Sequence, residues 1–197
     1  MKQPVPVTLE GAHVRLVPLT LAHLDAFSAV GLDPELWHLI PSKADTPEGM
    51  RVYVETALDE QRRGVSLPFV TTLKGTGQVI GSTRYMNIDV RNRRLEIGCT
   101  WIGKPWQRSV VNTEAKLLML EQAFEVLGCV RVELKTDFLN QQSRNAILRL
   151  GAKQEGIFRR HVLTWDGRMR DTVYFSILDD EWPALRAGLE AKLAARP

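Results

Sequence analysis

The sequence predicts an α+β domain built around one mixed β-sheet. Segments in which apolar residues alternate, as in strands, are interspersed with segments in which they recur at helical spacing. Most consecutive strands are separated by short turns, as in antiparallel pairs, whereas one pair in the second half is joined by a helix, as in a parallel crossover. A length of 197 residues is at the upper end of one compact domain, so residues 1–197 are expected to form a single domain.

The composition is that of an ordinary globular protein. Apolar residues make up 44% of the chain and charged residues 25%, which argues against a disordered chain. The isoelectric point is about 9.0, but the net charge is only +3. Because no basic and aromatic recognition motif accompanies this charge, we expect no nucleic-acid partner.

Neither the cysteines nor the hydropathy indicates a secreted or a membrane protein. Cys99 and Cys129 lie in apolar runs and lack the spacing of zinc ligands or of a disulfide framework. No apolar run reaches membrane-spanning length, and Met1–Val7 lacks a signal-peptide core. The expected setting is the reducing cytoplasm, with no metal and no membrane partner.

The first half of the chain predicts a strand, two helices and three further strands. The first strand is Gly11–Leu19; one helix runs from Thr20 to Gly31 and another from Thr46-Pro47 to Gly64. The three strands that follow are Leu67–Leu73, Gln78–Met86 and Leu95–Trp101. In the last strand we expect one face to carry Leu95, Ile97, Cys99 and Trp101.

The second half begins with the most regular helix pattern of the chain. Asn112 or Thr113 is expected to cap this helix, and Gly128 to end it. Its apolar stripe is Leu117, Leu120, Phe124 and Leu127, and the residues expected to face away are Glu114, Glu121 and Glu125. The remaining expected elements are a strand at Val130–Leu134, a helix from Asn140 to Leu150, strands at Gly156–Trp165 and Thr172–Leu178 around an Asp166-Gly167 turn, and a helix at Asp180–Ala195.

A loop between the Leu95–Trp101 strand and that regular helix is a candidate anion site. The loop is Gln107–Asn112, and Arg108 adds a charged donor. Unpaired backbone N–H groups and the helix dipole favour phosphate oxygens at a helix N-terminus.

The residues of this loop carry a family resemblance. The run Trp106–Ala115 resembles the acetyl-CoA pyrophosphate loop of GNAT acetyltransferases, which reads Gln or Arg, two residues, Gly, one residue, and Gly or Ala. Gln107 matches, whereas Val110 and Asn112 stand at the glycine places. Further segments, in order, resemble the RimJ/RimL-like branch between about Thr8 and Leu193: Glu96-Ile97-Gly98, Thr136–Ser143, Leu150-Gly151-Ala152, Asp171–Ser176 and Glu181-Trp182-Pro183.

The resemblance implies the GNAT fold, a mostly antiparallel central sheet with helices on both faces. It also implies transfer of an acetyl group from acetyl-CoA to a primary amine, such as a protein N-terminus of the ribosomal-protein type, in one ternary complex. The pantetheine arm would lie between two splayed strands, along the backbone from Gly98 to Ile102. The cofactor-binding residues implied are Cys99, Trp101, Ile102, Gln107, Arg108, Ser109, Val110, Val111, Asn112, Thr113, Asn140 and Ser143.

Two residues are the catalytic candidates that follow from the resemblance. Glu96 stands where some members keep a glutamate base; the alternative is a salt-bridged strand glutamate. Many members use a helix tyrosine as the acid, but Ile147 occupies that place. Ser143, three residues after Asn140, is the acid candidate of the RimJ/RimL-like branch; the alternative roles are a helix first-turn residue for Ser143 and an N-cap for Asn140.

Other polar and aromatic residues are weaker candidates. His161, with Arg159 and Arg160, could flank the acceptor and move a proton, although a lone histidine is more often an ordinary strand residue. Trp37, Trp101, Trp106 and Trp165 could line a pocket or belong to the core. No activating histidine or aspartate pattern accompanies the cysteines, so packing is their expected role.

The expected partners are acetyl-CoA and an amine acceptor. Relatives of this kind often dimerise, which makes a second copy of the chain a further candidate. An alternative function is a catalytically weak acyl-CoA-binding module, which Val110, Asn112 and Ile147 would favour.

Overall fold

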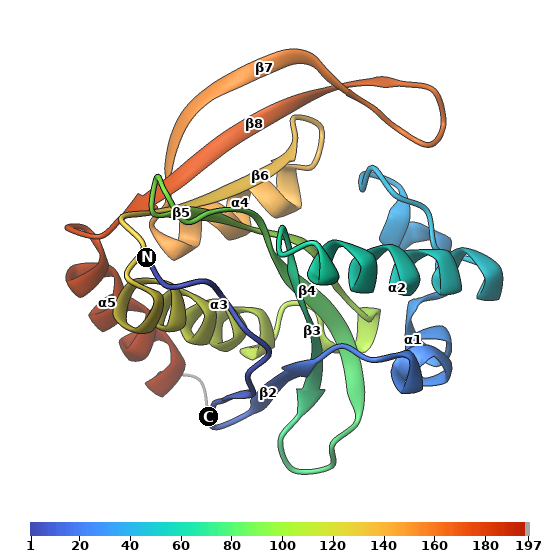
Figure 1. Ribbon diagram of the computed structural model, residues 1–197, viewed down its shortest axis with the longest axis horizontal. Coiled ribbons are helices and arrows are strands. Elements are labelled where there is room, and N and C mark those ends of the chain that lie inside the picture. Colours follow the sequence, from blue (N-terminus) through green and yellow to red (C-terminus); the bar gives the residue numbers. More distant parts are fainter. Residues whose placement is uncertain (196–197) are drawn as a thin grey trace.

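The computed structural model describes residues 1–195. Eight strands form one sheet in the order β1-β2-β3-β4-β5-β6-β8-β7 (Figure 1). They are β1 (Leu9–Glu10), β2 (Val14–Pro18), β3 (Leu67–Leu73), β4 (Val79–Asp89), β5 (Arg94–Ile102), β6 (Arg131–Asp137), β7 (Lys153–Leu163) and β8 (Met169–Leu178). β5 and β6 are parallel and every other neighbouring pair is antiparallel. The predicted mixed, mostly antiparallel sheet is confirmed.

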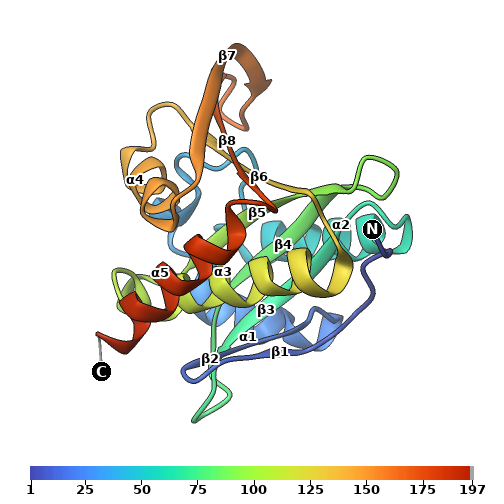
Figure 2. The same cartoon turned by 90° about the vertical axis from the view of Figure 1, so that its left-hand side faces the viewer.

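Helices cover both faces of the sheet. They are α1 (Leu24–Gly31), α2 (Pro47–Arg62), α3 (Val111–Glu121), α4 (Gln141–Leu150) and α5 (Trp182–Ala194), with short turns η1 (Leu21–His23), η2 (Pro34–Trp37) and η3 (Lys104–Trp106), and α3 continues as the π-helix η4 (Gln122–Leu127). α3, α4 and α5 pack on one face, and α1 and α2 pack on the other. Figure 2 shows α3 and α5 lying across the strands, with α1 and α2 behind them.

Several predicted helix ends follow from identifiable caps. The Thr46 hydroxyl accepts a hydrogen bond from the Gly49 N–H at 3.0 Å, and the Asn140 side chain accepts one from the Ser143 N–H at 2.9 Å. Gly128 and Gly151 have φ of 74° and 97°, a left-handed backbone that glycine adopts without a steric penalty. The predicted cap of α3 was wrong, because α3 already begins at Val111, whose N–H donates to the Ser109 hydroxyl at 3.3 Å.

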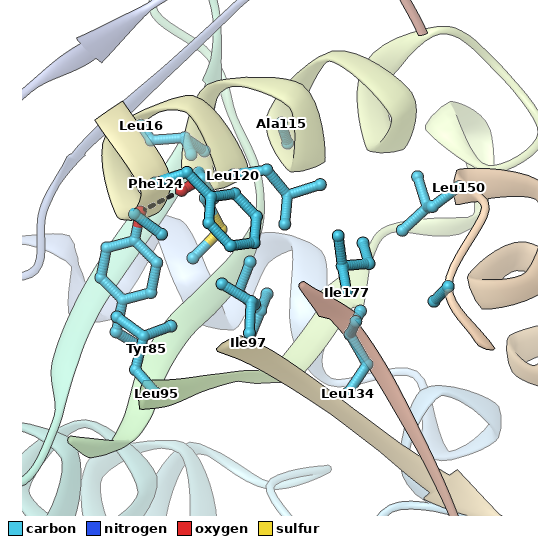
Figure 3. Packing of buried hydrophobic residues seen from close by; sticks show 14 of the residues in the cluster. Leu16, Tyr85, Leu95, Ile97, Ala115, Leu120, Phe124, Leu134, Leu150 and Ile177 are labelled. Carbon is cyan, nitrogen blue, oxygen red and sulfur yellow. Dashed lines mark hydrogen bonds between the residues drawn. The ribbon is translucent and has the colours of Figure 1, made fainter. Parts of the chain in front are cut away.

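The main core lies between the sheet and the α3 side. Figure 3 shows side chains from β4, β5, β6 and β8, such as Ile97, directed toward Leu120 of α3 and Phe124 of η4. Tyr85 is fully buried there, and its hydroxyl donates to the Met119 carbonyl at 2.6 Å. This hydrogen bond satisfies the polar end of an otherwise apolar contact, as buried tyrosines require.

Glu114 of α3 was predicted to face solvent, and that prediction was wrong. Its carboxylate is buried and accepts hydrogen bonds from the backbone N–H groups of Ala12, His13 and Val14 at 2.8, 2.8 and 2.7 Å. A carboxylate that accepts several backbone N–H bonds is stable in the interior. Glu114 therefore ties the β1–β2 turn to the first turn of α3.

β5 contains a bulge that changes which face its residues occupy. Arg84 of β4 pairs with Gly98, but Ser82 pairs with Trp101, and Cys99 between them has φ of +46°. Leu95 and Ile97 consequently belong to the main core, whereas Trp101 packs on the α1–α2 side. The prediction that these residues share a face was therefore wrong beyond the bulge, because one extra residue reverses the alternation.

β5 and β6 separate soon after they meet. Their ladder joins only Arg94–Glu96 of β5 to Arg131–Glu133 of β6. Beyond it, β5 stays with β4 as far as Ile102, and β6 stays with β8 as far as Asp137. The facing edges of the two strands are thus left without a strand partner over the second half of β5.

The change Glu114→Ala is expected to lower the free energy of unfolding by roughly 2–4 kcal/mol, because it leaves buried N–H groups without an acceptor. Urea titration followed by circular dichroism would measure this change. The matched control is Glu121→Ala on the same helix, since the Glu121 carboxylate is 38% exposed and pairs with Arg186 at 3.3 Å. That control is expected to cost less than about 1 kcal/mol, and an equal effect of both changes would contradict the assignment.

Candidate active site

A loop between β5 and α3 lies at the open end of the strand gap. The Gln107 side-chain amide donates to the Ile102 carbonyl at 2.8 Å, and its side-chain oxygen accepts from Gln142 of α4 at 3.4 Å. Gln107 therefore joins the end of β5 to the first turn of α4. The helix N-termini of α3 and α4 are brought together beside the gap.

The backbone N–H groups of this loop are available to a ligand. The first backbone hydrogen bond of α3 runs from the Glu114 N–H to the Val110 carbonyl at 2.9 Å. Among residues 107–113, the amides of Arg108, Ser109, Val110, Asn112 and Thr113 make no hydrogen bond within the described residues 1–195. Unpaired amides at the positive end of a helix dipole form an anion site, so the loop fits the pyrophosphate of a coenzyme A molecule.

The missing glycines do not distort this loop. Val110 has φ −69° and ψ −20°, which valine adopts without strain, and Asn112 lies inside α3. The left-handed residue of the loop is Arg108, with φ of +60°. Valine and asparagine at the two glycine places therefore cause no backbone strain in this loop.

α4 presents Ser143 on the α3 side of the sheet. The Ser143 N–H is held by the Asn140 cap, and its half-buried hydroxyl makes no hydrogen bond within residues 1–195. Ile147, one turn further along, is 7% exposed and belongs to the main core. The hydroxyl of Ser143 is thus a free donor, while Ile147 offers no proton.

Glu96 lies on the other face of the sheet, and it is both buried and paired. One carboxylate oxygen, Oε2, accepts from the Asn87 side chain at 2.7 Å and from Lys135 at 2.8 Å. The other oxygen, Oε1, makes no hydrogen bond within residues 1–195 and faces Gly98, whose missing Cβ would lie 3.1 Å from it. The salt-bridged interpretation of Glu96 is correct, yet one oxygen remains free for an amine or a water.

Lys135 contacts Glu96, Glu133 and the ring of Tyr174, and we call these four residues the polar face. The Lys135 ammonium lies 3.6 Å from Glu133 and 4.5 Å from the centre of the Tyr174 ring. Burial works against its charge, but Glu96 outweighs that effect, so the pKa of Lys135 lies above its usual value. Glu133, Lys135 and Tyr174 also line a surface groove that continues to Phe158 of β7.

Sequence reasoning missed Lys135 and Asn87. The alternation of β6 contained a signal for Lys135, since Val132 and Leu134 are core residues and Lys135 must face the other way. Its contact with Glu96 requires the parallel register of β5 and β6, in which Glu96 is opposite Glu133. That register is a tertiary property that no local pattern encodes.

The bulge residue Cys99 and the nearby Trp101 contact the α1–α2 side of the sheet. The Cys99 carbonyl accepts a hydrogen bond from the Tyr53 hydroxyl of α2 at 3.4 Å. Burial raises the pKa of the Cys99 thiol, which leaves it protonated and a poor nucleophile. The Trp101 side chain packs with Phe27 and Trp37, and its carbonyl oxygen faces Gly81 of β4 rather than the gap.

The β7–β8 hairpin reaches across to the segment between α1 and α2. The Trp165 ring N–H donates to the Trp37 carbonyl at 3.2 Å, and the Lys43 ammonium lies 4.4 Å from the Trp165 ring centre. His161 is exposed on β7 and its ring nitrogen lies 3.3 Å from the Tyr174 hydroxyl. Arg159 and Arg160 are exposed beside it, and the three residues line a surface hollow that shares Phe158 with the groove.

Lys116 of α3 is a buried charge that sequence reasoning also missed. Its ammonium donates to the hydroxyls of Thr83 and Thr100 at 3.1 and 2.7 Å, and no carboxylate within residues 1–195 forms an ion pair with it. Burial lowers the pKa of Lys116 to about 7. The lysine thus supports the bulged part of β5 while remaining partly neutral near physiological pH.

Comparisons with known proteins agree with this arrangement. The family model described as an acetyltransferase (GNAT) domain matches residues 13–153. The chain is 31% identical over 141 residues to YdaF of Bacillus subtilis (strain 168), provisionally named a ribosomal N-acetyltransferase, covering 71% of this chain and 76% of YdaF.

Solved structures share the fold over nearly the whole chain. A GCN5-related N-acetyltransferase from Brucella melitensis is 34% identical, with a TM-score of 0.88 over 97% of this chain and 87% of that chain. Mycobacterium smegmatis RimJ, solved in complex with CoA-disulfide, is 24% identical, with a TM-score of 0.82 over 100% of this chain and 98% of that chain. Among residues 1–195 no helix has the length and apolar character to cross a membrane, and no cluster of three or more candidate metal ligands is found.

The low pKa of Lys116 predicts a pH dependence of stability. Between its ordinary pKa of 10.5 and its folded pKa of about 7, the unfolded lysine binds a proton that the folded one does not, so stability falls as the pH falls. Lys116→Met is expected to reduce the pH slope of the unfolding free energy by up to about 1.4 kcal/mol per pH unit in that range. Urea titrations between about pH 7.5 and 9.5 would measure the slope, with Lys2→Met at an exposed position as the control. A slope that Lys116→Met leaves unchanged would show that the lysine is solvated.

Proposed function

Because the chain belongs to the GNAT family of N-acetyltransferases, we propose that it transfers the acetyl group of acetyl-CoA to the amine of a protein N-terminus. The observation that carries this proposal is the gap between β5 and β6, which has an amide-rich loop at one end, Glu96 on one face and Ser143 on the other. The name of YdaF, which specifies a ribosomal N-acetyltransferase, supports an amine of a ribosomal protein as the acceptor.

The coenzyme would be held mainly by backbone groups. The loop amides from Arg108 to Thr113 fit the pyrophosphate, and the Arg108 side chain adds a positive charge. The segment of β5 from Gly98 to Ile102 has no strand partner on the β6 side. The carbonyls of Cys99 and Ile102 accept from Tyr53 and Gln107, and backbone groups that remain free there can hydrogen-bond an extended pantetheine arm as a further strand would. Asn140 and Ser143 of α4 approach the same arm from the other side of the gap.

Acetyl transfer requires two proton movements. When bound, acetyl-CoA supplies an acetyl carbon activated by its thioester. Transfer forms a bond between the amine nitrogen and that carbon and breaks the carbon–sulfur bond, so the amine loses a proton and the sulfur gains one. Glu96 Oε1 is the oxygen free to receive the amine proton, directly or through a water, and the Ser143 hydroxyl is the donor free to face the sulfur.

The positions of these two groups favour direct attack in a ternary complex. Glu96 lies on the face of the sheet that carries α2, and Ser143 lies on the face that carries α3 and α4. An amine that approaches from the Glu96 face meets the thioester within the gap, while the leaving sulfur faces α4. A base and an acid on opposite sides of the reacting carbon need no covalent enzyme intermediate.

Calorimetric titration tests the coenzyme site. The protein is expected to bind acetyl-CoA saturably and ATP much more weakly, because the loop recognises a pyrophosphate whose pantetheine arm occupies the gap. Absence of binding would rule out the proposed function. Tight binding without transfer to a panel of peptide N-termini would instead favour the acyl-CoA-binding module, for which Ile147 in the place of a tyrosine is the remaining support.

Glu96→Gln is expected to lower kcat/KM by roughly 100-fold or more, because glutamine cannot accept the amine proton. The change keeps the size of the side chain and its contact with Lys135. The pH profile of kcat/KM is the deciding measurement, and the variant should lose the decline toward low pH.

Ser143→Ala is the matched comparison for that profile. It is expected to lower turnover while the affinity for acetyl-CoA and the low-pH decline stay as in the parent protein, since Ser143 acts on the leaving sulfur. If Glu96→Gln retains the decline, or if Ser143→Ala turns over at the parent rate, the corresponding role is refuted.

A further inference from the structure

Arg170 is a buried arginine on the same face of the sheet as Glu96. It belongs to β8 and precedes Thr172 by two residues. Thr172 pairs with Asp137, the last residue of β6, so Arg170 lies past the end of β6. Val173 and Phe175 face the main core, so the alternation of β8 places Thr172 and Arg170 on the opposite face. The hydrogen bond from Arg170 Nε to the Thr172 hydroxyl, at 3.1 Å, agrees with this placement.

The position of Arg170 is close to the strand gap. The charges of Asp137 and Glu96 act on Arg170, and the charge of Arg170 acts in turn on the thiol of Cys99 in the β5 bulge. Arg170 therefore lies just past the end of β6, on the face of the sheet that carries Glu96. Beyond Glu133, β6 has no partner in β5, so this end of β6 borders the strand gap in which the acceptor amine would have to lie.

Arg170 has no charged partner among the described residues 1–195. Its side chain is only 7% exposed, and within residues 1–195 no carboxylate lies within ion-pair distance of it. Its terminal nitrogens make no hydrogen bond in the same part of the chain. These terminal nitrogens can be reached from solvent. The fully buried side-chain atoms that lack a hydrogen-bond partner, such as Nε of Arg84, do not include them.

The two carboxylates whose charges act on Arg170 are already paired. Asp137 pairs with Arg168 at 2.5 Å, and Glu96 pairs with Lys135 at 2.8 Å. Both oxygens of Asp137 are in use, since the second accepts from the Leu139 N–H at 2.9 Å. Arg170 is the cation that remains after these pairs are formed, and Glu96 Oε1 is the acceptor that remains.

We propose that Arg170 binds a carboxylate of the acceptor, so that the substrate is an amine that carries its own carboxylate. This inference rests on the proposed acetyl transfer. Glu96 Oε1 receives the ammonium end and the Arg170 guanidinium receives the carboxylate end in a paired, two-point contact. A peptide that begins with an acidic residue and a free α-amino acid both present this chemistry.

Matched acceptors test the proposal. The parent protein is expected to acetylate a pentapeptide beginning with Asp with a kcat/KM roughly 10- to 100-fold above that for the same peptide beginning with Asn, because one charged hydrogen-bonding contact distinguishes them. Free glutamine and its α-amide form the second pair, because only the first carries an α-carboxylate, and this pair distinguishes an amino-acid acceptor from a peptide. Equal rates within both pairs would overturn the proposal.

Variants of Arg170 show whether this residue causes the preference for acidic acceptors. Arg170→Gln is expected to raise KM for the acidic acceptor to that of the neutral one while kcat changes little, and Arg170→Lys is expected to restore part of the preference. Arg91→Gln, which removes the same charge from the exposed β4–β5 turn, should leave the preference intact. A loss of kcat that is equal for acidic and neutral acceptors would show that Arg170 acts on the reacting thioester, and would overturn the proposal.

A binding measurement separates this inference from the proposed function. Calorimetry with CoA-saturated protein and the acetylated Asp and Asn peptides requires no turnover. Selective binding of the Asp peptide without any transfer would refute the acetyl transfer and retain the carboxylate site. Transfer without selective binding would support the acetyl transfer and refute the carboxylate site.

Thermal unfolding tests the premise that Arg170 has no partner in the free protein. Arg170→Met is expected to leave the thermal midpoint unchanged or higher, because an unpaired buried charge destabilises the fold. A large fall in the midpoint would show that the folded chain itself uses the charge, and would remove the basis of the proposal.

Discussion

The separation of β5 from β6 is the constraint on which the rest of the site depends. The two strands share a ladder of three residue pairs, and each then follows its other neighbour. The bulge at Cys99 contributes to this divergence, because an extra residue in β5 increases its twist and turns Trp101 into the α1–α2 cluster. Backbone groups that a sheet would normally satisfy are thereby left for a ligand, and groups from both faces of the sheet can meet in the same opening.

Much of this architecture was predictable from local patterns. Thr46, Asn140 and Gly128 set helix ends through caps that act within a few residues, so the sequence around them is sufficient. The bulge was not predictable, because Leu95, Ile97, Cys99 and Trp101 alternate without interruption in the sequence and only the pairing with β4 reveals the extra residue. The buried state of Glu114 depends on amides about a hundred positions away, which no helical periodicity contains.

In the candidate site too, features set by neighbouring residues were predictable from the sequence, and features set by contacts between distant segments were not. The loop and the first turn of α4 could be located from residues next to one another in the sequence. Val110 at a glycine place causes no conformational strain, because its φ is −69° and the left-handed residue of the loop is Arg108. Lys135 and Arg170 gain their meaning only when β6 and β8 lie beside β5, since each is defined by its relation to Glu96.

The buried charges differ in how the fold accommodates them. Glu114 is stabilised by three backbone N–H groups, and Arg84 by Glu60 and the Tyr53 ring. Within residues 1–195 Lys116 has no ion-pair partner, but a lysine can release its proton, and burial lowers the pKa of Lys116 to about 7. Burial also lowers the pKa of Arg170, yet a guanidinium stays protonated at any physiological pH. The cost of burying the Arg170 charge therefore persists in the free protein, and a bound anion would offset it. Lys116 can instead lose its charge, so the two buried cations without an ion-pair partner among residues 1–195 lead to different conclusions.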